Sequence, residues 1–225
     1  MDPPDALIFD FDGLILDTET CTYESVAEIF AEHGATLDLA WWHSILGTAD
    51  HPHWTEHLAA QLGRPVDRAA LVARREARRL PRIEALAACD GVADLLDAAD
   101  ARGVATAVAS SSASDWVVPH LERLGLGHRF RRVVTRDDVG GDGRRTKPAP
   151  DLFLIAAAEV GADPRRCVVL EDSPNGVAAG RAAGMAVVAA PGPLTRGLDF
   201  DAADLVVASL AGLDIATVAG LVPPR

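Results

Sequence analysis

The segment from Ala6 to Gly13 (Ala-Leu-Ile-Phe-Asp-Phe-Asp-Gly) constrains the fold of this chain more than any other. A short apolar run ends there in two carboxylates one residue apart, Asp10 and Asp12, followed by glycine. Such runs are typical of buried strands in parallel sheets. Ligands of open α/β sheets bind just beyond the carboxyl ends of the strands. Because alternate residues of an extended chain point to the same side, we expect both carboxylates to face one reacting group.

Short β-rich runs alternate with segments of helical length along most of the chain. The predicted helices between the strands include Ala113–Leu124, Ala149–Val160 and Asn175–Ala183. The predicted strands are Leu7–Asp10, Val104–Ser110, Arg132–Thr135, Cys167–Glu171, Ala186–Ala190 and Leu205–Val207. This alternation predicts an α/β fold with a doubly wound parallel sheet.

The interval from about Thr18 to Leu86 has no convincing strand pattern. It is expected to form several helices, for example over Thr20–Glu32, Pro52–Gln61 and Asp67–Arg79. We therefore predict a helical domain, residues 17–86, inserted into a core made of residues 1–16 and 87–225. An inserted module beside the strand ends is well placed to act as a lid.

The acidic balance of the chain argues against several classes of partner. A formal net charge of −12 disfavours binding to nucleic acid and to anionic membranes. No apolar run approaches the length of a membrane span, and the N-terminus lacks the features of a signal peptide. The three cysteines form no CxxC pair, so neither a disulfide framework nor a zinc site is indicated. We expect a cytoplasmic protein, either a monomer or a small homo-oligomer.

Polar residues follow the predicted strands at several separate places in the sequence. Since parallel strands align their carboxyl ends on one edge, we expect these residues to meet there. They are Asp10 and Asp12, Ser110-Ser111-Ser112, Lys147 before a helix, and Glu171-Asp172-Ser173. Lys147 is also the single lysine of the chain. Taken alone, Ser110–Ser112 and Glu171–Ser173 could each simply begin a helix.

The chemistry of this set points to phosphoryl transfer. Several carboxylates converging on one point repel each other, and a hard divalent cation such as Mg²⁺ removes that repulsion. A hydroxyl and an ammonium group would hold the remaining oxygens of a phosphate. An acidic pocket with a metal ion, a lysine and a serine is suited to transferring a phosphoryl group.

Four motifs in this order resemble those of the haloacid dehalogenase-like hydrolases. The first is Asp10-Phe-Asp12-Gly-Leu-Ile-Leu-Asp17-Thr-Glu, and Ser110 matches the second. Lys147 in Lys-Pro-Ala-Pro-Asp matches the third, and Glu171-Asp172-Ser-Pro-Asn-Gly matches the acidic fourth. The resemblance covers nearly the whole chain. The helical insert resembles the cap of the subgroup that contains β-phosphoglucomutase and many small-metabolite phosphatases.

This resemblance implies a role for each motif residue. Asp10 would be the nucleophile that forms an aspartyl-phosphate, and Asp12 the general acid and base. Mg²⁺ would be held by the carboxylates of Asp10 and Asp172 and by the main-chain carbonyl of Asp12, with Glu171 as a direct or water-bridged ligand. Ser110 and Lys147 would bind the phosphoryl oxygens.

Three further residues are predicted to bind substrate. They are Ser111, Arg75 and His51, the last of which lies in an aromatic and histidine-rich stretch of the insert. At least two of Trp41, Trp42 and Trp54 are expected to pack in the small core of the insert. Asp17 and Glu19 are interpreted first as hinge or helix-start residues.

The sequence thus predicts a Mg²⁺-dependent phosphatase acting on a small phosphorylated metabolite, such as a sugar or polyol phosphate. A phosphosugar mutase is the nearest alternative. A mutase must bind a second phosphate with its cap. The segment from Gly47 to Pro52 lacks the arginine expected for that binding. A catalytically inactive binding relative is the third possibility.

Overall fold

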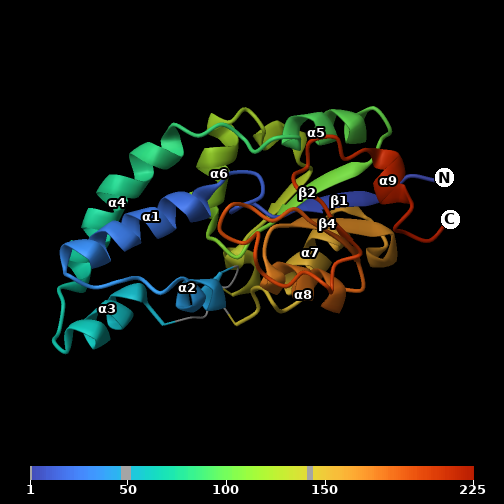
Figure 1. Cartoon of the computed structure of the whole chain (residues 1–225). Coiled ribbons are helices and arrows are strands. Elements are labelled where there is room, and N and C mark those ends of the chain that lie inside the picture. Colours follow the sequence, from blue (N-terminus) through green and yellow to red (C-terminus); the bar gives the residue numbers. More distant parts are fainter. Residues whose placement is uncertain (1, 47–51, 141–143) are drawn as a thin grey trace.

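The computed structural model describes residues 2–46, 52–140 and 144–225. Within this part of the chain, parallel strands form a sheet in the order β3-β2-β1-β4-β5-β6, which confirms the predicted doubly wound α/β fold (Figure 1). The strands are β1 (Ala6–Phe9), β2 (Ala105–Ala109), β3 (Arg132–Val134), β4 (Cys167–Glu171), β5 (Ala186–Ala189) and β6 (Leu205–Val206). Phe9 of β1 is in register with Val108 of β2 and Leu170 of β4, so these three strands end together.

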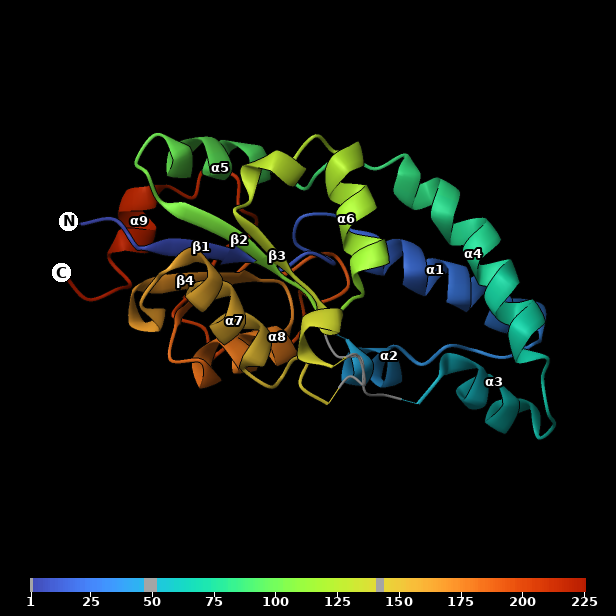
Figure 2. The ribbon, with the colours of Figure 1, turned by 180° about the vertical axis from the view of Figure 1, so that it is seen from behind.

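The helices divide into those that cover the sheet and those of the insert, which lie beyond one end of the sheet and come between β1 and β2 in sequence (Figures 1 and 2). The insert contains α1 (Thr18–Glu32), α2 (Leu39–Ile45), α3 (Trp54–Leu62) and α4 (Arg68–Glu84). The rest are α5 (Val92–Asp100), α6 (Ser114–Arg123), α7 (Asp151–Val160), α8 (Pro174–Ala182) and α9 (Ile215–Ala219). None of these described helices combines the length and apolar character needed to cross a membrane.

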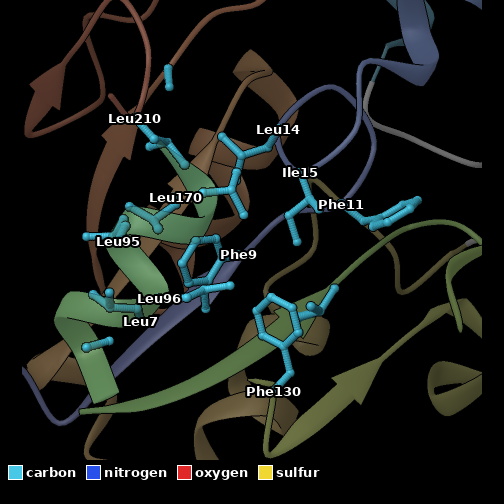
Figure 3. Packing of buried hydrophobic residues seen from close by; sticks show 14 of the residues in the cluster. Leu7, Phe9, Phe11, Leu14, Ile15, Leu95, Leu96, Phe130, Leu170 and Leu210 are labelled. Carbon is cyan, nitrogen blue, oxygen red and sulfur yellow. The ribbon is translucent and has the colours of Figure 1, made fainter. Parts of the chain in front are cut away.

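Strand β1 is buried on both faces, which explains why its sequence is apolar throughout rather than alternating. Leu7 and Phe9 face a cluster built with residues of α5, α6 and α9. Ala6 and Ile8 face a second cluster built with residues of α7 and α8. Figure 3 shows the first cluster, in which the ring of Phe9 lies near that of Phe130 with centroids 5.6 Å apart. The sheet is therefore the middle layer of three.

The insert has a hydrophobic core of its own. The residues buried there are Val26, Ile29, Phe30, Leu37, Trp42, Leu46, Trp54, Leu58 and Leu71. The burial of Trp42 and Trp54 confirms that at least two of the three tryptophans pack in this core. The domain limits at residues 16/17 and 86/87 remain a prediction. Hydrogen bonds between the insert and the sheet domain include one from His43 to the Leu194 carbonyl (2.8 Å) and one from Asn175 to the Leu46 carbonyl (2.6 Å).

Helix α4 is longer than the predicted segment Asp67–Arg79. It continues to Glu84 although Pro81 lies inside it and cannot donate a main-chain hydrogen bond. Burial of Ile83 in the sheet-domain core stabilises this last part of the helix. The side chain of Arg123 also donates to the terminal carbonyls of Ile83, Glu84 and Leu86 at 2.8–3.2 Å. These long-range contacts override the local effect of proline.

The buried Arg166 side chain joins the two ends of the described chain. Its Nε donates to Asp5 (2.9 Å) and one Nη to the carbonyl of Pro3 (2.6 Å). The other Nη donates to the carbonyl of Pro223. The N- and C-terminal segments therefore lie close together, at the end of the sheet opposite the insert (Figure 1).

Gly91 at the start of α5 is a position where no other residue fits. Its φ is +87°, and an added Cβ would lie 2.1 Å from the main-chain carbon of Leu210. We expect Gly91→Ala to lower the free energy of unfolding by about 2–4 kcal/mol, since a left-handed conformation and a main-chain clash both oppose it. Urea denaturation measures this loss.

Gly184→Ala is the matched control. Gly184 also has a positive φ, +73°, but an added Cβ would have no neighbour within 4 Å. Gly184→Ala should therefore lower the free energy of unfolding by only about 1–2 kcal/mol, the cost of the left-handed conformation. Equal losses in the two variants would contradict the packing argument.

Candidate active site

Asp10 and Asp12 lie in the turn that directly follows β1. The main-chain N–H of Asp10 donates to the carbonyl of Leu170 (2.9 Å), so Asp10 continues the alignment with β4. The turn closes through Gly13, whose N–H donates to the Leu16 carbonyl (2.8 Å). Gly13 has φ +90°, and an added Cβ would lie 2.0 Å from a carboxylate oxygen of Asp172. A side chain here would therefore fill the space beside Asp172.

Lys147 is buried between two carboxylates. Its Nζ forms ion pairs with Asp10 and with Oε1 of Glu171, the latter at 2.7 Å. The side chain is only 1% exposed. Burial tends to lower the pKa of this ammonium, but the charges of Asp10 and Glu171 outweigh it and raise the pKa above its ordinary value. Lys147 is therefore a fixed positive charge beside Asp10.

Glu171 is held by the turn between β4 and α8. Its Oε2 accepts hydrogen bonds from the N–H groups of Asp172 (2.9 Å) and Ser173 (3.0 Å) and from the Ser173 hydroxyl (3.0 Å). Ser173 Oγ in turn accepts from the N–H of Gly176 (3.1 Å) and caps α8. An added Cβ at Gly176 would lie 1.7 Å from Oε1 of Glu171. The turn thus fixes Glu171 so that Oε1 faces Lys147.

Three carboxylates gather at this edge of the sheet. Oxygens of Asp10, Glu171 and Asp172 all lie within 4.8 Å of one another, as predicted from the shared edge of the strands. Burial, partly offset by Lys147, raises the pKa of Asp10 to about 8, and Glu171 adds to the rise. Burial and the charges of Glu171 and Asp10 raise the pKa of Asp172 well above its ordinary value.

The residues present fit a hard divalent cation. Carboxylate oxygens are ligands that Mg²⁺ prefers, and a cation among them would offset both the burial of their charges and the repulsion between them. Gly13 leaves the space beside Asp172 open. The predicted ligand in Asp12 is its main-chain carbonyl, and that assignment stays a prediction.

The carboxylate of Asp12 accepts hydrogen bonds from several elements. Oδ1 accepts from the Thr18 hydroxyl (2.7 Å) and from the indole N–H of Trp116 (2.8 Å). Oδ2 accepts from the Ser112 hydroxyl (2.6 Å), whereas that of Ser110 is more distant, at 3.4 Å. Asp12 is thus oriented independently of the cluster around Lys147.

A cavity of about 480 Å³ opens in front of these carboxylates. Its walls come from both the sheet domain and the insert, including the predicted site residues Ser110, Ser111 and Arg75. Arg75 also donates to Glu76 (Nε to Oε1, 3.0 Å) and lies 5.9 Å from the centre of the Trp54 ring. The third predicted substrate contact, His51, lies outside the described residues.

Glu19, Arg79 and Trp116 also line the cavity and were not predicted to do so. Burial and the nearby charges of Asp12 and Asp10 raise the pKa of Glu19 to about 8, although Arg79 opposes this. The sequence held one usable signal for Arg79, its spacing of four residues from Arg75 on the same helix. No local pattern indicated which face of α6 would carry Trp116 towards Asp12.

The model of the haloacid dehalogenase-like hydrolases matches residues 4–184. This chain belongs to that family. It is 42% identical to the Bacillus subtilis (strain 168) protein named "Putative phosphatase YhcW" over 211 residues, 94% of each chain. It is 35% identical to fructose-1-phosphate phosphatase YqaB of Escherichia coli (strain K12), over 81% of this chain and 94% of the relative.

Solved structures of the family share the whole fold. A variant of CbbY from Rhodobacter sphaeroides, crystallised with xylulose-(1,5)bisphosphate, matches 98% of this chain and 100% of its own. The TM-score is 0.72 and the sequence identity 27%. The predicted family resemblance is thus confirmed, and the match extends over both the sheet domain and the insert.

The carboxyl cluster should make the metal-free protein less stable as pH rises. Folded Asp10, Glu19 and Asp172 have raised pKa values, so between about pH 4 and pH 8 the folded state binds more protons than the unfolded chain. The free energy of unfolding therefore falls through this range. We expect the Tm in chelator to drop from pH 5.5 to 8.5.

Asp172→Asn should reduce this slope, since it removes one of the protonating carboxyls. Asp94→Asn, at an exposed position on α5, is the control and should leave the slope unchanged. A wild-type Tm that rises with pH over the same range would contradict the prediction.

Proposed function

We propose that this protein is a Mg²⁺-dependent phosphatase that hydrolyses a small phosphorylated metabolite, a sugar or polyol phosphate, through an aspartyl-phosphate. The observation that carries the proposal is the buried Asp10 carboxyl, paired with Lys147 and opening on a cavity. The names of similar proteins support the substrate class. YqaB is named a fructose-1-phosphate phosphatase, and the CbbY structure holds a sugar bisphosphate.

In the first step a carboxylate oxygen of Asp10 attacks phosphorus, and the bond from phosphorus to the ester oxygen breaks. The protonated Asp12 donates its proton to the departing alkoxide, which leaves as an alcohol. In the second step water attacks the phosphorus of the aspartyl-phosphate and gives a proton to Asp12. The bond between phosphorus and Asp10 breaks, which restores the carboxylate and releases inorganic phosphate.

Charge stabilisation is assigned to the residues around Asp10. The side chains of Asp10 and Asp172 and the main-chain carbonyl of Asp12 would hold Mg²⁺, with Glu171 as a direct or water-bridged ligand. When bound, the ion would neutralise the charge that builds up on the phosphoryl oxygens. Lys147 and Ser110 would hold other phosphoryl oxygens. Because Lys147 is anchored by Glu171, it needs little rearrangement to do so.

Recognition of the rest of the substrate is assigned to the cavity walls. Ser111 lines the cavity from the sheet domain, and Arg75 lines it from the insert. His51 is proposed as a further contact on sequence grounds. The hydroxyl groups of a sugar would meet polar side chains here, whereas Trp42 and Trp54 offer apolar surface to its carbon skeleton.

Phosphate release from a panel of phosphorylated sugars, polyols and short acids tests the proposal. We expect Asp10→Asn to lose at least about 10³-fold in kcat with the fold intact, since the amide cannot act as nucleophile. Asp94→Asn serves as the control and should keep the wild-type rate. Substantial turnover by Asp10→Asn would rule out the covalent route. No release by wild type from any compound would favour a mutase or a binding role.

Metal dependence is tested separately. Chelator should abolish turnover, and added Mg²⁺ should restore it. Asp172→Asn should raise the Mg²⁺ concentration needed for half the maximal rate, because it removes a carboxylate from the cluster. Full activity in excess chelator would overturn the metal assignment.

A further inference from the structure

The orientation of the Asp12 carboxyl depends in part on Trp116, a side chain to which the proposed reaction assigns no role. The indole N–H of Trp116 donates to Oδ1 of Asp12 at 2.8 Å. Trp116 lies on α6, more than a hundred residues from Asp12 in sequence. Oδ1 also accepts a hydrogen bond from the hydroxyl of Thr18, and Oδ2 accepts one from the hydroxyl of Ser112. A short hydrogen bond from a fixed donor orients its acceptor, so losing this donor should loosen Asp12.

The indole of Trp116 is in turn held by a contact from the insert. The guanidinium carbon of Arg79 lies 4.3 Å from the centre of the ring, within the range of a cation–π contact. Arg79 is held in turn by Glu76, with Nη2 donating to Oε2 at 2.9 Å. The indole also meets the ring of His120 in a T-shaped contact, with centroids 4.4 Å apart. Trp116 therefore has little freedom to turn.

Helices α4 and α6 meet at a second point. Arg123, two turns after Trp116 on α6, donates to main-chain carbonyls in the last turn of α4 and just after it. Figure 2 shows α6 next to the end of α4 that is nearer the sheet. The two contacts together fix the place of Arg79 over Trp116. A continuous set of contacts, from Arg79 of the insert through Trp116 to Asp12, thus links the docking of the insert to the orientation of Asp12.

We infer that Trp116 is a positioning residue for Asp12, and that Arg79 transmits the docking of the insert to it. The inference rests on the proposed function, in which Asp12 is the general acid and base. Neither side chain needs to touch the reacting atoms. When α4 sits on α6, Arg79 fixes the plane of the indole, and the indole N–H fixes the carboxyl of Asp12 towards the leaving oxygen.

Trp116→Phe tests the first link, because it removes the N–H donor and keeps a smaller aromatic ring against Arg79. The test compares two esters, p-nitrophenyl phosphate and the alkyl phosphate that wild type hydrolyses best. Nitrophenolate leaves without a proton, whereas an alkoxide needs one from Asp12. We expect kcat/KM to fall about tenfold for the alkyl ester and less than about twofold for the aryl ester.

The ratio of the two kcat/KM values is measured on one preparation, so it does not depend on the fraction of folded enzyme. An equal fall for both esters, or no change for either, would overturn the positioning role. If wild type hydrolyses neither ester, the proposed function itself fails, which is a distinguishable result.

Arg79→Met tests the second link. Methionine keeps an unbranched stem beside the indole but has no charge. We expect it to change the ratio in the same direction as Trp116→Phe, and the double variant to show less than the product of the two effects. Arg78→Met is the matched control, since Arg78 pairs with Glu28 and Glu32 within the insert. Multiplicative effects, or an equal change in Arg78→Met, would overturn the coupling.

Discussion

The buried ammonium of Lys147 is the interaction on which the site depends. An unpaired charge in the protein interior costs several kcal/mol, and here one cation meets Asp10 from the end of β1 and Glu171 from the end of β4. The pairing is possible because Phe9 and Leu170 are in register, so the two strands end level. The sheet topology and the charge pattern are therefore two aspects of one arrangement.

The same ammonium leaves the three carboxylates two positive charges short of neutrality. Lys147 contacts two carboxylates, yet a third, that of Asp172, lies within the same 4.8 Å group. Burial, together with the charges of the neighbouring carboxylates, raises the pKa values of Asp10 and Asp172. A divalent cation or bound protons must make up the difference, and a phosphate ester adds further negative charge. The acidic cluster at this end of the sheet is therefore suited to a divalent cation.

The sequence predicted the sheet edge well because strand ends follow from local pattern and from the geometry of parallel sheets. Asp10, Lys147, Glu171 and Asp172 meet as expected, though their chemical roles remain proposals. The partners of Asp12 could not be predicted in the same way. Ser112 rather than Ser110 makes its short hydroxyl contact. Trp116 reaches Asp12 only through the packing of α6, which no local pattern specifies.

The insert was predictable as helical, but its detailed contacts were not. Glu19 lies in the first turn of α1, as interpreted, but its place in the cavity wall was not predicted, nor was its pKa, which burial and the nearby Asp12 raise. Helix α4 continues past Arg79, where the predicted helix ended. Its last turn is stabilised because Ile83 packs in the core of the sheet domain and accepts a hydrogen bond from Arg123. Both differences arise where two parts of the chain meet, and such contacts depend on tertiary structure.

The hydrogen bonds from Arg166 to both terminal segments have a consequence for engineering the molecule. They hold Pro3 and Pro223 to one guanidinium, so the two chain ends leave the protein at a single place, remote from the insert. A short peptide could join them, and a new break could be made in an exposed turn, to give a circularly permuted enzyme with the same sheet. Attachment to a surface through either end would likewise leave the insert and the cavity facing the solution.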